Sequence, residues 1–362
     1  MTQLKDVYGI ISFEEKNIKI SVFQVEKQSK HCLYFRNIFL NDTINSHLKL
    51  NRERLLAYLR QELIKVETVI GVNVIRYLIL VPHLNMTINS KSSDEITYTN
   101  KNDLESYITN LPTSEEFVCL NRSITEYVVN EQVLTTAPID GSLKVNYIEY
   151  LARKNDVKDF VELINALNIE PLGFYNNPIA YKNSILDHNE KTRMLIDMLE
   201  ESTNIYFYDK KTDLYRTATI DQGKNWFVNK VSEKIKLSKE DTLNILESFR
   251  NIKHISQNVV VCNYHNDHYK SLQQLDTAYL KTMISNLIGE YFQLVVKGCE
   301  KVNADSIHFN CDDALFECFD FKLNGNDPVT INRVKVETQQ QNIIGLEDDN
   351  VSNVICLLTG AI

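Results

Sequence analysis

The spacing of apolar residues along the chain follows two periods, which together predict a mixed α/β protein. Short apolar runs rich in β-branched and aromatic residues predict strands at 7–40, 75–81, 193–209 and 214–220. Apolar side chains at intervals of three and four residues instead predict amphipathic helices at 51–66, 101–111, 156–167 and 277–302, the third of them capped by Asp156. Because strands and helices alternate, we expect sheets covered by helices.

Two stretches, 8–23 and 193–209, share the pattern of a β-hairpin, in which one apolar run leads into a short polar loop and another leads out. Each places a pair of glutamates in the loop, Glu14-Glu15 in the first and Glu200-Glu201 in the second. Each also places an Asn-Ile pair at the start of the returning strand. A repeat separated by half the chain indicates two halves built on one plan.

These residues resemble the hairpins that hold the phosphates of ATP in the actin-like ATPases, and most closely those of the FtsA family of bacterial cell-division proteins. The first family hairpin reads roughly Ile-Asp-Ile-Gly-Ser-Thr-Lys-Ile-Lys, and residues 11–19 keep its frame. The second reads roughly Leu-Ile-Asp-Ile-Gly-Gly-Gly-Thr-Thr-Asp-Ile and is similar to residues 195–205. The resemblance implies an α/β, actin-like (ribonuclease H-like) fold of two lobes.

The resemblance also implies four parts, one of them an FtsA-type inserted subdomain. The first lobe (1A) takes 1–82 and 151–190, the insert (1C) 83–150, the core of the second lobe (2A) 191–225 and 303–362, and its outer subdomain (2B) 226–302. In the insert we expect a loop at 89–102, strands at 117–120 and 124–129, and a turn at 137–141. Residues 351–362 resemble the helix that closes the second lobe, and no intrinsic membrane anchor is expected after it.

The loops that should contact ATP keep the frame of the family motifs and lose most of the glycines. A third acidic pair, Asp312-Asp313, stands where the resemblance places the loop that grips adenosine, and Gly223 remains in a turn where the family has two glycines. Ser12 replaces an aspartate that helps to hold the metal in the family. The remnants of the nucleotide site are therefore Ser12, Glu14, Glu15, Lys19, Asp197, Glu200, Glu201, Ser202, Thr203, Gly223, Asp312 and Asp313.

Glutamate is poorly suited to a phosphate loop for two physical reasons. Glycine lets the backbone approach the anion and adopt positive φ, and a glutamate side chain fills that space. Charge acts in the same direction, because two unit charges about 5 Å apart repel by about 3 kcal/mol at an effective dielectric constant of about 20. Several such contacts cancel the ~8 kcal/mol of a micromolar affinity. We therefore expect a pseudo-ATPase without catalytic residues and without a cofactor, the alternative being a site for ATP with Mg.

Two other interpretations of the acidic pairs stay open. In the first, the glutamates simply lie in exposed turns of an α/β protein that is unrelated to the actin-like ATPases. In the second, the six carboxylates form a site for a divalent cation. A separate cluster, Cys262, His265 and His268, has a spacing found in metal sites. Because structural zinc takes four ligands, a polar surface loop is the favoured interpretation of this cluster, and no metal is expected there.

Composition argues against several classes of function. A chain of 362 residues can form two or more domains with a sizeable core, and a net charge of −9 without a basic run disfavours nucleic-acid binding. The N-terminus lacks the pattern of a signal peptide, and no apolar stretch is long enough to predict a membrane span. The seven cysteines are scattered singly, which indicates reduced thiols and a cytoplasmic location.

Basic residues in the outer part of the second lobe are candidates for binding a partner. The resemblance implies that this subdomain binds the C-terminal peptide of FtsZ, an acidic and apolar tail. The charges of Lys234, Lys236, Arg250 and Lys253 suit such a peptide. The alternative for each single residue is an ordinary solvated helix face.

The leading hypothesis is a non-catalytic, FtsA-like division adaptor that binds FtsZ and associates with itself. Because no anchor is expected in the chain, a partner would recruit it to the division site at the membrane. One alternative is an active actin-like ATPase or sugar-kinase-like enzyme, against which the missing glycines argue. The other is a PilM-like platform that docks a short peptide of a secretion or pilus component.

Overall fold

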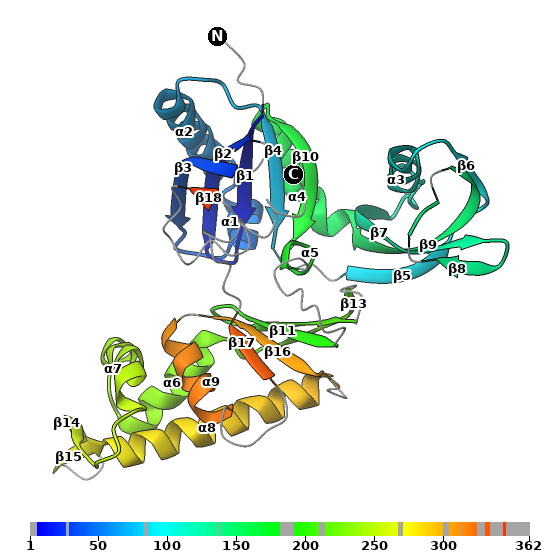
Figure 1. Ribbon diagram of the computed structural model, residues 1–362. Helices are drawn as coiled ribbons and strands as arrows, with labels where there is room; N and C mark the ends of the chain where they lie inside the picture. The colour runs from blue at the N-terminus through cyan, green and yellow to red at the C-terminus, as the bar shows by residue number, and fades with distance from the viewer. Residues whose placement is uncertain are drawn as a thin grey trace. The chain divides into compact units, whose positions relative to one another are not determined.

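The computed structural model describes residues 6–26, 29–82, 86–134, 136–138, 140–181, 192–209, 214–266, 271–299, 304–311, 313–323, 330–333 and 343–344. Figure 1 shows their elements, and the chain divides into two compact units that we describe separately. Unit 1 comprises Met1–Leu186, Asp213–Tyr215 and Lys335–Ile362, and unit 2 comprises Asp187–Thr212 and Arg216–Val334.

Unit 1 is built on a six-stranded sheet with the order β10-β4-β1-β2-β3-β18. Its strands are β1 (Val7–Phe13), β2 (Asn17–Glu26), β3 (Ser29–Phe39), β4 (Arg76–Val81), β10 (Glu170–Asn176) and β18 (Ile343–Ile344). The first three are antiparallel neighbours, whereas β4 and β10 run parallel to β1. The three strands predicted at 7–40 and the buried strand predicted at 75–81 are confirmed.

The helices described beside this sheet are α1 (Ile44–Leu50), α2 (Arg52–Ile70), α4 (Lys154–Ala166) and α5 (Asn177–Tyr181). α2 continues past its predicted end at Val66 and stops where Gly71, at φ +77°, takes the left-handed conformation. α4 begins at Lys154, so the prediction that Asp156 is its N-cap was wrong. Asp156 lies in the first turn, where its charge still favours the helix dipole.

The predicted insert forms a second sheet in unit 1, with the order β5-β9-β7-β8 and β6 paired to β9. Its elements are β5 (Met86–Ser92), β6 (Ile96–Tyr98), α3 (Lys101–Thr109), β7 (Phe117–Val129), β8 (Gln132–Leu134) and β9 (Gly141–Arg153). α3 and the sheet share an apolar cluster of their own, which includes Leu104, Ile108, Tyr127 and Val145. The insert therefore has its own small core.

Two predictions for the insert were wrong in detail. The polar stretch 89–102, expected as a loop, contains part of β5 and all of β6. Strands with one face in solvent take polar residues, which hides them in a search for apolar runs. The two strands expected at 117–120 and 124–129 form one long strand, β7, whose pairing with β9 is irregular near Cys119 and Ile124.

Unit 2 repeats the strand order of unit 1, with the sheet β13-β12-β11-β16-β17. Its strands are β11 (Arg193–Met198), β12 (Thr203–Tyr208), β13 (Leu214–Ile220), β16 (Ser306–Asn310) and β17 (Thr330–Arg333). The antiparallel hairpin β11–β12 corresponds to β1–β2, and β16 and β17 run parallel to β11 as β4 and β10 do to β1. The two halves are thus built on one plan, as the repeated hairpin predicts.

The described helices of unit 2 are α6 (Lys224–Ile235), α7 (Lys239–Ile252), α8 (Thr277–Cys299) and α9 (Asp313–Leu323). A small hairpin of β14 (Val260–Asn266) and β15 (Ser271–Asp276) joins α7 to α8. The apolar stripe predicted along α8, from Leu280 to Cys299, is buried in the core of the unit. In Figure 1, α6, α8 and α9 lie along one side of the sheet.

Some predictions fall on residues outside the described ranges, among them the closing helix at 351–362, part of the turn at 137–141, and His268. Six of the seven cysteines are described, and all six are free thiols. Within the ranges that the structure describes, no helix combines the length and the apolar character that a bilayer span requires.

Candidate functional site

The first hairpin, β1–β2, closes through a tight turn with Glu15 and Lys16 at its tip. The N–H of Glu14 donates to the carbonyl oxygen of Asn17 at 2.8 Å. Ser12 is fully buried and lies on β1 opposite Lys19 on β2. The frame of residues 11–19 is therefore the hairpin that the sequence predicts.

Glu14 and Lys19 form an ion pair within this hairpin. The Nζ atom of Lys19 lies 2.6 Å from Oε1 of Glu14, and the two side chains are 6% and 19% exposed, respectively. Because Lys19 compensates the carboxylate, the expectation that Glu14 repels phosphate as an isolated charge does not hold. The ammonium group of Lys19 is in turn engaged by a carboxylate of the same hairpin.

The tip of the first hairpin is fastened to the segment that follows β3. The carbonyl oxygen of Glu15 accepts from the N–H of Ile44, the first residue of α1, at 2.8 Å. The carbonyl oxygen of Lys16 accepts from the N–H of Leu40 at 2.7 Å. Backbone N–H groups at the start of a helix can donate to a phosphate, and here one of them is used by the hairpin.

The second hairpin, β11–β12, has the same turn, and its register corrects the repeat that the sequence suggests. The N–H of Leu199 donates to the carbonyl oxygen of Ser202 at 2.9 Å, in the place that Glu14 takes in the first turn. Leu199 is therefore equivalent to Glu14, and Glu200 to Glu15. Both glutamate pairs lie in turns as predicted, but they are displaced from each other by one residue.

The turn of the second hairpin caps the start of α6. The N–H of Lys224 donates to the carbonyl oxygen of Leu199, and the N–H of Asn225 donates to that of Glu200, both at 2.9 Å. The first N–H groups of a helix have no partner within the helix and form a natural anion site. At α6 two of these donors are already satisfied by the turn.

Side chains reinforce this contact between the turn and the helix. Nζ of Lys224 lies 3.7 Å from Oε1 of Glu200, and Nδ2 of Asn225 donates to Oε1 of Glu201 at 2.8 Å. The carboxylates of the second acidic pair are thus each in contact with a first-turn residue of α6. They contribute to closing the turn on the helix.

Gly223 is required because the turn approaches the backbone before α6 very closely. A Cβ atom at this position would lie 2.4 Å from the carbonyl oxygen of Leu199, 2.6 Å from the nitrogen of Ser202 and 2.8 Å from the carbonyl carbon of Glu200. These are all backbone atoms, so no side-chain rotation relieves the contact. Gly223 therefore allows the backbone before α6 to pack against the turn of the second hairpin.

Thr203 joins the second hairpin to two other parts of unit 2. Its hydroxyl donates to the carbonyl oxygen of Gln222 at 2.6 Å and accepts from the hydroxyl of Tyr291 on α8 at 2.9 Å. Both Thr203 and Tyr291 are fully buried, and burial raises the pKa of the tyrosine hydroxyl, which stays neutral. Thr203 therefore has a structural role.

Asp197, the family aspartate that survives in the second hairpin, is fully buried at the end of β11. The amide nitrogen Nδ2 of Asn310, at the end of the neighbouring strand β16, donates to its Oδ1 at 2.7 Å. Burial, and then the charge of Asp197, raise the pKa of the buried Tyr206 hydroxyl. Asp197 thus links two strands of the sheet.

The third loop follows β16 and is described only in part. Asp312 lies outside the described residues, and of Asp313 the structure describes only the backbone, as the first residue of α9. The prediction for this pair therefore stays a prediction. Among the residues whose placement is described, no group of three or more His, Cys, Asp or Glu is close enough to hold a metal ion.

Sequence reasoning missed Lys224 and Asn225, which complete the contact with the second hairpin. Both follow Gly223 directly at the start of an amphipathic stretch. A glycine before a helix start was the available signal, because it marks a place where another part of the backbone comes close.

The four basic residues predicted to bind a partner differ in how much of their charge is available. Lys234 lies on α6, 3.6 Å from Glu290, and Lys236 is the exposed left-handed residue that ends α6. Arg250 is 75% exposed and lies 3.8 Å from Glu317. Lys253 is only 10% exposed and is held by carboxylates of α9. Three of the four face solvent, and the fourth is part of the fold.

Replacing Lys253 with alanine is expected to destabilise unit 2, because its ammonium lies 2.6 Å from Glu317 and 2.7 Å from Asp320. We expect a loss of about 1–2 kcal/mol in the free energy of unfolding, measured by urea denaturation. Arg250→Ala is the matched control, and an exposed pair at long distance should cost less than about 0.5 kcal/mol. Equal losses for the two variants would contradict a structural role for Lys253.

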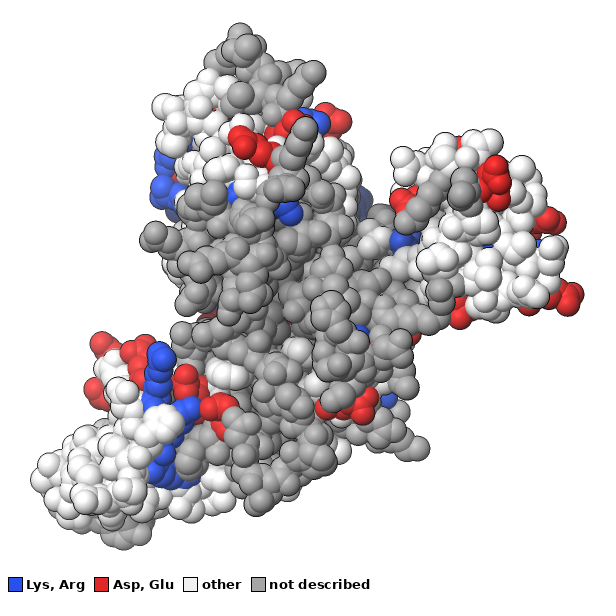
Figure 2. Space-filling model, in the orientation of Figure 1, with Lys and Arg blue, Asp and Glu red and all other residues white. Residues whose placement is uncertain are grey.

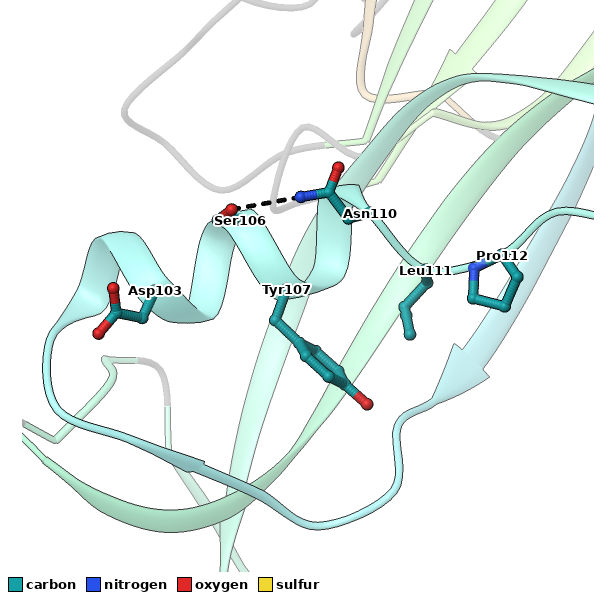
Figure 3. Close-up of a pocket in the computed structure, with 6 residues that line it drawn as sticks. All are labelled: Asp103, Ser106, Tyr107, Asn110, Leu111 and Pro112. Atoms are coloured by element: carbon teal, nitrogen blue, oxygen red, sulfur yellow. Dashed lines mark hydrogen bonds between the residues drawn. The ribbon is translucent and has the colours of Figure 1, made fainter.

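The insert carries an open hollow on the surface of α3, with a volume of about 520 Å³ (Figure 3). Asp103, Ser106, Tyr107, Asn110, Leu111 and Pro112 line it. Tyr107 is 42% exposed and, with Leu111 and Pro112, supplies its apolar surface. Figure 3 shows the Tyr107 ring on the same side of the helix as these two residues.

A buried charge cluster fixes the helix that carries this hollow. Nη1 of Arg122 on β7 donates to the carbonyl oxygens of Ile108 and Thr109 at the end of α3, at 3.3 and 2.8 Å. Its Nε lies 3.6 Å from Glu149, which also pairs with Lys91 at 2.5 Å. Burial alone would raise the pKa of Glu149, but hydrogen bonds and the neighbouring positive charges lower it. The glutamate is thus held as an anion.

The insert carries most of the excess negative charge of the chain. Residues 83–150 contain four Lys or Arg against ten Asp or Glu, a net charge of −6 out of −9 for the whole chain. Two of the four basic residues, Lys91 and Arg122, are paired with Glu149. Figure 2 shows carboxylates around the edge of the insert and few basic side chains on the face in view.

No family model and no curated relative matches the sequence. Solved structures do match its fold. A PilM-PilN type IV pilus biogenesis complex matches with a TM-score of 0.52 at 10% identity, over 100% of both chains. MreB5 of Spiroplasma citri bound to ADP matches with a TM-score of 0.50 at 7% identity, over 99% of this chain and 96% of that chain. The same protein bound to AMPPNP gives 0.50 at 8% identity, over 99% and 97%.

The chain has the actin-like fold. The matches extend over its whole length, and the repeated strand order of the two units agrees with them. At 7–10% identity they establish the architecture of the chain, as the two hairpins predicted.

Proposed function

We propose that this actin-like chain is a non-catalytic adaptor of the FtsA kind, a pseudo-ATPase that binds the C-terminal peptide of FtsZ and associates with itself. The observation that carries the first part is the closure of the second hairpin on α6. Two N–H donors of the helix, on Lys224 and Asn225, are already bonded to carbonyl oxygens of the turn. A phosphate would have to displace both contacts.

The first hairpin supports the same proposal. Its tip is bonded to the N–H of Ile44, and Lys19 is engaged by Glu14. In an active actin-like ATPase or sugar-kinase-like enzyme such donors could contact ATP with Mg, and their engagement here supports an adaptor without a cofactor. Asp197 and Thr203 also form hydrogen bonds within unit 2, to Asn310 and to the carbonyl oxygen of Gln222.

The proposed contact with FtsZ depends on the solvent-facing basic residues of unit 2. Figure 2 shows basic side chains gathered on this unit next to carboxylates. Lys234, Lys236 and Arg250 face solvent and suit an acidic, apolar peptide, whereas Lys253 is engaged inside the fold. Recruitment of the chain to the division site at the membrane would then follow from a partner.

A labelled FtsZ tail peptide tests this contact by fluorescence anisotropy. We expect micromolar binding, with a Kd of about 1–100 µM at low salt, weakened about tenfold by Arg250→Glu because a rim charge governs encounter with an acidic peptide. Lys297→Glu, an exposed charge reversal on α8 of the same unit, is the control and should leave Kd within about twofold. An absence of binding at about 1 mM protein would contradict the division role.

A second candidate function is a PilM-like platform that docks a short peptide. The match to the PilM-PilN complex over the whole chain favours it, and so does the insert, where an apolar hollow at Tyr107 lies in a strongly acidic part of the chain. Such a surface suits a peptide with basic and apolar residues. Binding of a PilN peptide that is lost in Tyr107→Ala, with no binding of the FtsZ peptide, would decide for this candidate.

A further inference from the structure

The hairpin β14–β15 in unit 2 is a two-stranded sheet that stands apart from the five-stranded sheet (Figure 1). Its strands pair antiparallel with each other from Val260 to Asn266 and from Ser271 to Asp276. Among the strands that the structure describes, neither takes a second neighbour. Within the described ranges, the edge of β14 that faces away from β15 is therefore open to a further strand.

Large apolar side chains are exposed along this hairpin. Val259, which precedes β14, and Val260, its first residue, are each 46% exposed, and Leu272 on β15 is 69% exposed. Tyr264 and Leu275 point into the core of unit 2 and are 8% and 0% exposed. The hairpin is therefore packed on the unit by one face, whereas Val259, Val260 and Leu272 are exposed to solvent.

The edge of β14 lacks the charged residues that several other outer strands carry. β5 carries Lys91, β10 carries Glu170 and Pro171, and β13 carries Arg216, all of which oppose pairing with a foreign strand. Residues 255–266 contain no Lys, Arg, Asp, Glu or Pro, although the chain as a whole has a net charge of −9. This strand is uncharged in an acidic protein, and β-branched residues at 259–261 favour an extended conformation.

We propose that two copies of this chain pair through the free edges of their β14 strands, antiparallel about a twofold axis. The occupant is a second copy because antiparallel self-pairing places residues of one sequence opposite each other across the axis, and a strand without charged residues meets no like-charge pair in any register. Pairing would convert two hairpins into one four-stranded sheet and cover Val259 and Val260. The inference names a surface for the self-association proposed above, and it is independent of nucleotide and peptide binding.

Analytical ultracentrifugation of the full chain tests the proposal. The wild-type chain is expected to form a reversible dimer, and Val260→Lys should raise its dissociation constant at least about tenfold, because it places two ammonium groups in an uncharged interface. Val296→Lys is the matched control, an equally exposed valine (50%) on α8 of the same unit, and should stay within about twofold of the wild type.

Hydrogen exchange keeps the proposal testable without any variant. In the wild-type chain, amide protection of β14 should rise between about 1 and 200 µM protein, whereas that of β7 should stay constant. A wild-type chain that remains monomeric at about 200 µM would overturn the proposal. It would be overturned equally by a dimer that Val260→Lys and Val296→Lys weaken to the same extent, or by one whose β14 amides gain no protection.

Discussion

Gly223→Ala is expected to lower the free energy of unfolding by about 3 kcal/mol. The added Cβ would meet three backbone atoms of the second turn at 2.4–2.8 Å, so either the turn or the start of α6 has to move. Movement would also break the hydrogen bonds from the N–H groups of Lys224 and Asn225. Chemical denaturation followed by circular dichroism measures the loss.

Gly289→Ala is the matched control for this variant. Gly289 lies inside α8, and a Cβ there has no neighbour within 4 Å. The same substitution should therefore stabilise the chain by about 1 kcal/mol, because alanine is the better helix former. If Gly223→Ala proved as stable as the wild type, the turn would not lie against α6 as described.

Lys19→Met is expected to destabilise the chain by about 3 kcal/mol, because it leaves the largely buried carboxylate of Glu14 without its cation. Methionine keeps most of the volume of the side chain, so the effect reports the charge. Thermal and urea denaturation of Glu14→Gln, Lys19→Met and the double variant give the coupling energy between the two residues.

The double variant decides whether the pair acts as a unit. Removal of both charges should restore part of the stability that Lys19→Met loses, since replacing both members of a buried pair costs far less than breaking it. Additive losses from the two single variants would show that the two charges do not interact, and would remove the argument that Glu14 is neutralised within its hairpin.

The architecture could be predicted from the sequence because it depends on long apolar runs. The strands at 7–40, 75–81 and 193–209 and the stripe along α8 are buried on one or two faces, so their periodicity is strong. The repeat of two hairpins indicated two similar halves, and the strand orders of the two sheets agree. Polar strands in the insert were missed because half of their surface lies in water.

The details of the site were less accessible, because they depend on contacts between distant residues. The sequence placed Glu14 and Glu200 in turns but could not show which residues they face. The register that makes Leu199 equivalent to Glu14 is set by one hydrogen bond in each turn. Lys253 looked like a solvent-facing charge because its partners, Glu317 and Asp320, lie more than sixty residues further along the chain.

These contacts change the reason for expecting a pseudo-ATPase. The sequence argument was repulsion between carboxylates and phosphate, and the structure weakens it for Glu14, which is paired with Lys19. It also shows that the turns occupy helix N–H groups that could otherwise bind a phosphate. We therefore still expect no nucleotide binding, now because of the geometry of the two turns.

Isothermal titration of the unmodified chain with ATP and Mg measures whether the second hairpin and α6 leave room for a nucleotide. We predict no saturable binding up to about 1 mM nucleotide, because the turn of the second hairpin and the start of α6 would have to separate first. A dissociation constant of about 10 µM or tighter would contradict the account.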